Sequence, residues 1–233
     1  MTAPANNADL RDKEKQAAAR AAVQLVEAGN IVGLGSGSTA AYAVRFLADR
    51  VREGLKIVGI PTSKQTKHLA EQLGIPLATV DEHREIDIDI DGADEIDPQL
   101  SLIKGGGGAF LREKIIASVS RRFIVIGDSA KQVKRLGKFP LPVEVVPFAQ
   151  SLIKHRIEGL GAKVSLRTYA YGNPYLTDEG HYILDCTFGE IANPPALAAE
   201  LRCIPGVLEH GLFIGMAEMA LIGKDGEVVQ LRR

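Results

Sequence analysis

Tryptophan is absent from this chain of 233 residues, only two cysteines occur, and aromatic residues make up 5% of the sequence. Cys186 and Cys203 are too few for a disulfide framework, and no histidines accompany them at the spacing of a zinc site. A reducing compartment is therefore expected, and the predicted location is the cytoplasm. The segment from Met1 to Lys15 has no apolar signal core, and no apolar run approaches the roughly 18 residues that cross a bilayer. We expect no membrane association.

An excess of positive charge is also missing, because 28 Lys and Arg residues are balanced by 29 Asp and Glu residues. Binding to nucleic acid or to a membrane surface through general charge needs clustered positive residues. The balance argues against such partners and favours a small-molecule ligand. The hydrophobic fraction of 45% is ordinary for a globular protein, and the length allows one large α/β domain or two small ones.

Short apolar segments alternate with helical patterns through the first part of the chain. Helices are expected at 9–28, 39–47 and 63–73, and strands at 31–34, 56–60, 75–80, 86–90 and 123–126. This alternation predicts an α/β fold with a doubly wound, mainly parallel, Rossmann-like sheet. Ligands of such sheets bind beyond the carboxyl ends of the strands.

Prolines after Gly137 mark a change that predicts a second domain. The expected order there is strand, helix, strand, strand, helix, strand, at 143–146, 148–160, 163–167, 182–186, 195–202 and 207–209. That order is typical of a small α+β domain of the ferredoxin-like type. Asp225-Gly226 between apolar runs predicts a hairpin that returns to the first domain. The predicted domains are a Rossmann-like catalytic domain, 1–138 plus 212–233, and a small α+β domain, 139–211.

The loop between Gly33 and Thr39 combines backbone N–H groups, hydroxyls and a helix N-terminus, which suit a phosphate. Ser38 stands where a dinucleotide-binding fingerprint has its third glycine, and no lysine follows Gly37 as in a P-loop. A phosphorylated small molecule is favoured over a nucleotide. The alternative for this loop is a tight turn capped by Ser or Thr.

Carboxylates are concentrated between Asp87 and Asp97. Asp87 and Asp89 alternate with isoleucines, and we expect them on the wetter face of a strand. Asp91 and Asp94 follow that strand at a turn and are expected in the ligand crevice, with Asx-turn or capping duty as the alternative. The cluster contains no histidine and lacks calcium-loop spacing, so no metal site is predicted.

Four consecutive glycines follow Lys104, and such a run favours a close approach of backbone to a ligand. Glu113 lies in the first two turns of the next helix, where a first-turn acid favoured by the helix dipole is the competing interpretation. Lys131 follows another strand and could equally be a surface lysine.

Six motifs in this order resemble the ribose-5-phosphate isomerase A family. They lie at 35–40, 91–95, 104–107, 112–114, 129–132 and 137–144, and segments 205–207 and 211–213 extend the resemblance over nearly the whole chain. Two positions depart from the family pattern: Ser36, where many members carry Thr, and Gly108, where others have Ala.

The resemblance implies interconversion of D-ribose 5-phosphate and D-ribulose 5-phosphate, in the non-oxidative branch of the pentose phosphate pathway. It implies a homodimer or homotetramer without metal or organic cofactor. Glu113 would be the acid–base residue, Asp91 and Asp94 would orient hydroxyls and assist ring opening, and Lys104 would stabilise the enediolate. The implied substrate-binding residues are Lys15, Ser36, Gly37, Ser38, Thr39, Asp91, Gly92, Ala93, Asp94, Lys104, Gly105, Gly106, Gly107 and Lys131.

Two alternatives stay open on the sequence. Related folds occur in regulators that bind sugar phosphates without turnover, but those usually carry a basic DNA-binding module that this chain lacks. Coenzyme A transferases resemble the fold and use a glutamate nucleophile, although no nucleotide-sized motif is present.

Overall fold

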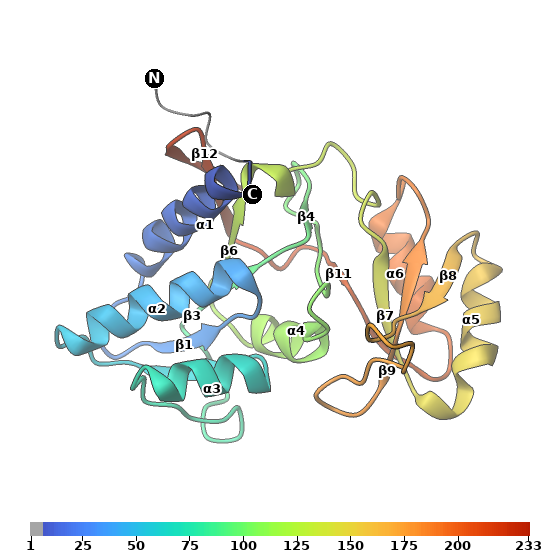
Figure 1. Cartoon of the computed structure of the whole chain (residues 1–233), viewed down its shortest axis with the longest axis horizontal. Helices are drawn as coiled ribbons and strands as arrows, with labels where there is room; N and C mark the ends of the chain where they lie inside the picture. The colour runs from blue at the N-terminus through green and yellow to red at the C-terminus, as the bar shows by residue number, and fades with distance from the viewer. Residues whose placement is uncertain (1–6) are drawn as a thin grey trace.

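The computed structural model describes residues 7–233 and contains three sheets (Figure 1). The largest, here the main sheet, has the strand order β13-β12-β6-β3-β1-β2. Its strands are β1 (Ile31–Leu34), β2 (Val58–Pro61), β3 (Ile88–Gly92), β6 (Phe123–Asp128), β12 (Met219–Lys224) and β13 (Glu227–Arg232). All neighbours pair in parallel except β13, which is antiparallel to β12. The predicted mainly parallel sheet is confirmed, and so is the hairpin that returns to it.

Helices cover both faces of the main sheet, as doubly wound topology requires. The helices are α1 (Asn7–Val23), α2 (Ser38–Arg52), α3 (Lys64–Gln72) and α4 (Phe110–Ser118). Alanines and aliphatic residues of α1 and α2 pack on Ile88 and Ile90 of β3, while Phe110 and Ala117 of α4 pack against Phe123 of β6. Within residues 7–233, no helix has the length and apolar character needed to cross a bilayer.

The small sheet is antiparallel with the order β10-β7-β9-β8. Its elements are β7 (Leu141–Val145), α5 (Gln150–Glu158), β8 (Lys163–Leu166), β9 (Tyr182–Thr187), α6 (Pro194–Arg202) and β10 (Val207–His210). The βαββαβ order of the ferredoxin-like prediction is confirmed. Ile153 and Ile157 of α5 and Leu201 of α6 bury the helices against this sheet.

A third sheet that the sequence analysis did not anticipate lies between the other two. It pairs β4 (Glu95–Ile96), β5 (Leu102–Ile103) and β11 (Leu212–Phe213) in antiparallel fashion, and we call it the bridging sheet. The buried Glu95 carboxylate accepts hydrogen bonds from the backbone N–H groups of Gly137 and Phe139, at 2.7 and 2.6 Å. It thereby fixes the path of the chain towards the small sheet.

Two expected elements differ in the structure. The strand expected at 75–80 is absent, and a single bridge from Leu77 to Gly59 stands in its place. Pro76, which precedes Leu77, has no N–H to donate to a neighbouring strand. The helix expected at 9–28 ends at Val23. The Arg50 guanidinium of α2 donates hydrogen bonds to the carbonyl oxygens of Val23 and Val26. The remaining regular segments are two short 3-10 helices, η1 (Ser129–Lys131) and η2 (Pro147–Ala149).

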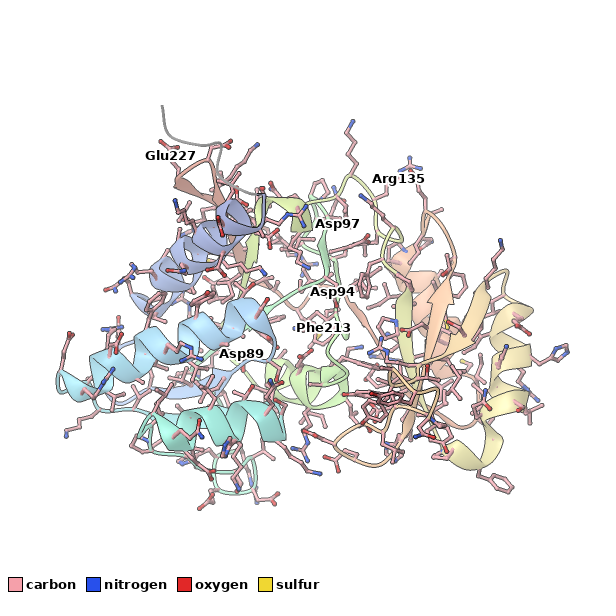
Figure 2. All side chains as sticks on the ribbon, viewed as in Figure 1. Asp89, Asp94, Asp97, Arg135, Phe213 and Glu227 are labelled. Atoms are coloured by element: carbon pink, nitrogen blue, oxygen red, sulfur yellow. The ribbon has the colours of Figure 1, made fainter. Side chains whose placement is uncertain are left out.

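Asp89 corrects the expectation that it would lie on the wetter face of its strand. Its side chain is fully buried, and neither carboxylate oxygen has a hydrogen-bond partner within residues 7–233 (Figure 2). It occupies the face of β3 that α4 covers, against Gly33 and Ile116. Burial, followed by the charge of Asp91, raises the pKa of Asp89 well above its ordinary value. Asp89 therefore resists ionisation in the folded protein.

Asp89→Asn is expected to raise the free energy of unfolding at neutral pH. An unfolded Asp ionises above about pH 3.9, so folding must return a proton to Asp89 and loses up to about 1.4 kcal/mol per pH unit until its folded pKa is reached. Asn carries no such penalty. Urea unfolding at about pH 5 and about pH 8 should show an advantage of the variant that grows with pH. Asp87→Asn, whose side chain reaches solvent, is the control; a constant or negative difference for Asp89→Asn would contradict the prediction.

Candidate active site

A cavity of about 100 Å³ lies at the carboxyl ends of β1 and β3, where the bridging sheet meets α4. Its walls are the loop after β1, the loop after β3, the glycine loop after β5, one helical glutamate and the lysine of η1. The lining residues are Ser36, Gly37, Ser38, Thr39, Gly92, Ala93, Asp94, Lys104, Gly105, Gly106, Gly107, Glu113 and Lys131. The structure thus brings together the three loops singled out from the sequence.

A larger hollow of about 390 Å³ lies beside β2 and α4. Most of its lining is apolar, with Leu77, Val80 and Ile115 among the residues, and its acid Glu179 is already paired with Arg112. It holds no carboxylate–lysine cluster that could move a proton. The chemistry is therefore assigned to the smaller cavity.

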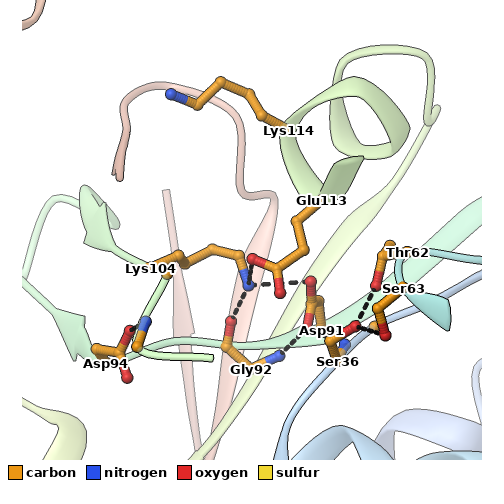
Figure 3. Close-up of polar contacts among 12 residues, drawn as sticks. Ser36, Thr62, Ser63, Asp91, Gly92, Asp94, Lys104, Glu113 and Lys114 are labelled. Atoms are coloured by element: carbon orange, nitrogen blue, oxygen red, sulfur yellow. Dashed lines mark hydrogen bonds and ion pairs between the residues drawn. The ribbon is translucent and has the colours of Figure 1, made fainter. Parts of the chain in front are cut away.

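Lys104 is the centre of the polar network in Figure 3. Its Nζ lies 2.9 Å from Oδ2 of Asp91 and 3.2 Å from Oε2 of Glu113, and it also donates to the carbonyl oxygen of Gly92. Burial lowers the pKa of Lys104, but the charges of Asp91 and Glu113 outweigh burial and raise it above its ordinary value. The ammonium is a fixed positive charge on the cavity wall.

Glu113 comes from the first turn of α4, and 5% of its surface is exposed. Burial raises the pKa of Glu113 to about 8; the charge of Asp91 adds to the rise, and Lys104 opposes it. A carboxylate with a pKa near neutrality can both take and return a proton. The neighbouring Lys114 points away from the cavity, towards Glu209 of β10 at 2.7 Å (Figure 3).

Asp91 lies beneath the cavity and does not line it, because its side chain is fully buried. Its Oδ1 accepts from the backbone N–H groups of Ser36 and Gly92, at 3.0 and 2.7 Å. A Cβ at Gly35 would lie 2.3 Å from this oxygen, so the loop after β1 can pass Asp91 only as glycine. Asp91 is connected to the cavity through Lys104, which does line it.

Asp94 does face the cavity, from the turn that precedes β4. Its Oδ2 accepts from the Gly106 N–H at 2.7 Å, and its Oδ1 lies 4.0 Å from Nζ of Lys131. Asp94 thus connects the glycine loop to the lysine of η1. In Figure 2 it lies with Phe213 between the main sheet and the small sheet.

The Ser36 hydroxyl is turned away from the cavity into a cluster of hydroxyls that the sequence analysis missed. It lies 2.8 Å from Oγ1 of Thr62, 2.7 Å from Oγ of Ser63 and 3.1 Å from Oγ1 of Thr66. Ser63 also caps α3, since its side chain accepts from the Thr66 N–H. The signal that could have revealed this cluster is the position of 62–66 after β2, at the same carboxyl edge of the sheet as Ser36.

The N-terminus of α2 also lines the cavity. Gly37 is its N-cap with φ +96°, a conformation that favours glycine, and no side chain caps the helix. The first N–H groups of a helix without a side-chain cap can bind an anion. Lys15 of α1 does not line the cavity, but its Nζ donates to Oγ of Ser38 at 3.1 Å.

Two residues of the second half of the chain also reach the site and were missed. Arg167 and Tyr175 donate to carbonyl oxygens of the glycine loop. No local motif marks either residue, because their contacts cross more than sixty positions of sequence.

A metal centre finds no support in the side chains: residues 7–233 contain no group of three or more His, Cys, Asp or Glu arranged to hold an ion.

Comparisons with known proteins match ribose-5-phosphate isomerases over most of the chain. The family model for ribose 5-phosphate isomerase A (phosphoriboisomerase A) matches residues 58–227. Ribose-5-phosphate isomerase A of Synechococcus sp. (strain JA-3-3Ab) is 54% identical over 225 residues, covering 95% of this chain and 98% of the relative. The enzyme of Roseiflexus castenholzii is 52% identical over 220 residues, covering 93% and 94%.

Two solved structures are similar over nearly the full length. Ribose 5-phosphate isomerase A from Methanocaldococcus jannaschii has a TM-score of 0.92 at 42% identity and covers 98% of this chain and 100% of its own. A D-ribose-5-phosphate isomerase in complex with phospho-erythronic acid has a TM-score of 0.93 at 40% identity, covering 96% and 99%. With this fold, this cavity and these matches, the chain belongs to the ribose 5-phosphate isomerase A family.

Proposed function

We propose that this chain interconverts D-ribose 5-phosphate and D-ribulose 5-phosphate through an enediolate, with Glu113 carrying the proton. The observation that carries the proposal is the contact of Glu113 with Lys104, 3.2 Å apart, in a cavity that the uncapped N-terminus of α2 also lines. One carboxylate, one fixed cation and an anion-binding helix end are the groups that isomerisation of a phosphorylated aldose needs.

Glu113 takes the proton from C2 of the open-chain sugar while the C1 carbonyl oxygen becomes the negative oxygen of an enediolate. The hydroxyl proton passes from O2 to O1, and Glu113 returns its own proton to C1, which leaves the carbonyl at C2. The Lys104 ammonium stabilises the negative oxygen that develops between these steps. Its charge is already paired and oriented before substrate arrives, so little reorganisation accompanies the reaction. The pKa of Glu113, about 8, leaves about a tenth of it ionised at pH 7 and favours return of the proton.

For the two aspartates we propose different roles. Asp91 acts from below the cavity, by holding Lys104 and the Ser36 N–H in place. Asp94 faces the cavity and orients a sugar hydroxyl, assisting ring opening. Gly92, Ala93 and Gly105 shape the cavity wall through their backbone.

The phosphate binds at the opposite end. We assign it to the N–H groups at the start of α2, Ser38 and Thr39, with Lys131 and Lys15 supplying positive charge. The ligand phospho-erythronic acid in the related structure carries a phosphate and a carboxylate, the charge pattern of an enediolate sugar phosphate. The regulator and coenzyme A transferase alternatives are not favoured, because the similar proteins over the full chain are isomerases.

Assembly and cofactor requirement follow from the family resemblance, and location follows from the scarcity of cysteine. We propose a homodimer or homotetramer in the cytoplasm that needs neither metal nor organic cofactor. We also propose that the catalytic domain is formed by 1–138 plus 212–233, with 139–211 as the small domain. Residues 1–6 of that range lie outside the described structure.

Glu113→Gln is expected to lower kcat by about 100- to 10,000-fold while ribose 5-phosphate still binds, because the amide keeps the shape but cannot accept a proton. Ketose formation from ribose 5-phosphate measures turnover, and calorimetry measures binding. Glu190→Gln, an exposed surface change, is the matched control. More than about a tenth of the original activity in Glu113→Gln would place the base elsewhere.

The pH profile of kcat/KM should fall on its acid side near about pH 8. Glu113 works as a base only when ionised, so activity is present above its raised pKa and is lost as pH falls through it. An ordinary glutamate would place this limb near about pH 4.3. The substrate phosphate ionises near about pH 6, so the profile with unphosphorylated ribose separates the two groups. An acid limb between about pH 4 and 5 with both substrates would contradict the assignment.

Lys131→Ala is expected to weaken kcat/KM for ribose 5-phosphate by about one to two orders of magnitude, since a charge-assisted hydrogen bond contributes about 1.5–3 kcal/mol. Use of free ribose should hardly change. Lys134→Ala, an exposed lysine three residues on, serves as control. Equal losses on both substrates would show that Lys131 serves the chemistry or the fold instead of the phosphate.

A further inference from the structure

The glycine loop of the cavity is held from outside by the segment that follows β8. Nη1 of Arg167 donates to the carbonyl oxygens of Gly105 and Gly106, at 2.8 and 3.2 Å. The Tyr175 hydroxyl donates to the carbonyl oxygen of Gly107 at 3.1 Å. Three consecutive carbonyl oxygens of the loop are therefore bound by residues that do not line the cavity.

Asp185 of β9 aims the Arg167 guanidinium at the loop. Its Oδ2 accepts from Nε at 3.0 Å, and its Oδ1 accepts from Nη2. This two-point pairing fixes the plane of the guanidinium and leaves Nη1 for the loop. The Arg167 side chain is 13% exposed, so the pair is largely shielded from solvent.

The loop has no side chains of its own with which to fix its conformation. Glycine has the greatest backbone freedom of any residue, and here Gly105 and Gly108 adopt φ values of +107° and +81°. A Cβ at Gly108 would lie 2.5 Å from the Tyr175 hydroxyl, so this tyrosine packs directly on the loop. A turn hydrogen bond from the Gly108 N–H to the Gly105 carbonyl oxygen closes the loop, and the contacts of Arg167 and Tyr175 add to its order.

Because the peptide group is planar, a contact that holds its C=O also fixes the direction of its N–H. In a trans peptide the C=O of one residue and the N–H of the next point in opposite directions. The Gly105–Gly106 peptide shows both ends: its C=O accepts from Arg167, and its N–H donates to Asp94, which lines the cavity. The next peptide has its C=O on Arg167 as well, and the Gly107 N–H has no acceptor within the described residues.

We propose that Arg167 is a positioning residue for the isomerase reaction: by holding the Gly106 carbonyl it turns the Gly107 N–H into the cavity, where that N–H donates to the developing enediolate oxygen. The inference rests on the proposed isomerase function and adds that the small sheet supplies part of the order of the active site. Tyr175 supports the same peptide chain one residue further on.

Arg167→Met tests this role. Loss of a donor to an oxyanion costs about 10²–10³ in kcat, and loosening such a donor should cost somewhat less. We expect kcat to fall by about ten- to a hundredfold with KM within about threefold, because the phosphate end of the cavity is untouched. Arg167→Lys keeps the charge but not the planar fork and should recover only part of the loss. Tyr175→Phe should lose a few-fold in kcat.

Ligand binding separates positioning from a general structural role. Calorimetry with phospho-erythronic acid probes the negatively charged centre together with the phosphate site, whereas inorganic phosphate probes the phosphate site alone. Arg167→Met should weaken phospho-erythronic acid by about the same factor as kcat/KM and leave the Kd of inorganic phosphate unchanged. Equal weakening of both ligands would overturn the proposal, because it would show general disruption of the cavity.

Arg135→Met, which removes an exposed arginine paired with Glu190, is the control and should leave kcat unchanged. Where Arg167→Met folds poorly in a urea titration, Asp185→Asn and Tyr175→Phe give the same readouts independently. An active unaltered chain with kcat unchanged in these variants overturns the positioning role and leaves the isomerase function standing. An unaltered chain that does not isomerise ribose 5-phosphate overturns both.

Discussion

The Lys104 ammonium, 3% exposed between the Asp91 and Glu113 carboxylates, is the contact on which the rest of the site depends. A buried charge without partners costs several kcal/mol, and here two carboxylates and the Gly92 carbonyl oxygen provide the compensation. The Phe213 ring centroid lies 5.4 Å from the same Nζ and closes the network on the side of the bridging sheet. Removal of Lys104 would leave the two buried carboxylates without their cation, so these groups act as a unit.

This unit draws each of its members from a different element of the fold. Asp91 is carried by β3, Lys104 follows β5, and Glu113 belongs to α4. The core beside this unit is unusually polar: both carboxylate oxygens of the buried Asp89 lack a hydrogen-bond partner among the described residues. A face of β3 that would be aliphatic in a purely structural sheet carries acids instead, and the other face keeps the isoleucines that bury α1 and α2. Local departures from good packing are common where a protein builds a reactive site.

The two ends of the cavity are built in different ways. The proposed phosphate site uses the start of α2, whose N–H groups are fixed by the helix itself. The proposed reacting end uses a loop of glycines that has one turn hydrogen bond of its own and is held further by Asp94 on one side and by Arg167 and Tyr175 on the other. In the proposed mechanism, substrate affinity comes from the main sheet, and the alignment of the reacting atoms comes in part from the small sheet.

Local patterns in the sequence were enough to predict the parallel sheet, the βαββαβ unit and the terminal hairpin, since strand and helix periodicity and the Asp-Gly turn act within a few residues. They also singled out the loops at 33–39, 91–94 and 104–107, because glycines and acids after strands mark the ligand edge of such a sheet. Sequence could not reveal that Asp89 and Asp91 are buried, that the Ser36 hydroxyl joins Thr62 and Ser63, or that Arg167 reaches the glycine loop. The burial of a strand's face depends on which helix packs over it, and long polar side chains choose partners across tens of residues. These contacts form only when the sheets and helices pack together, so the tertiary structure alone decided them.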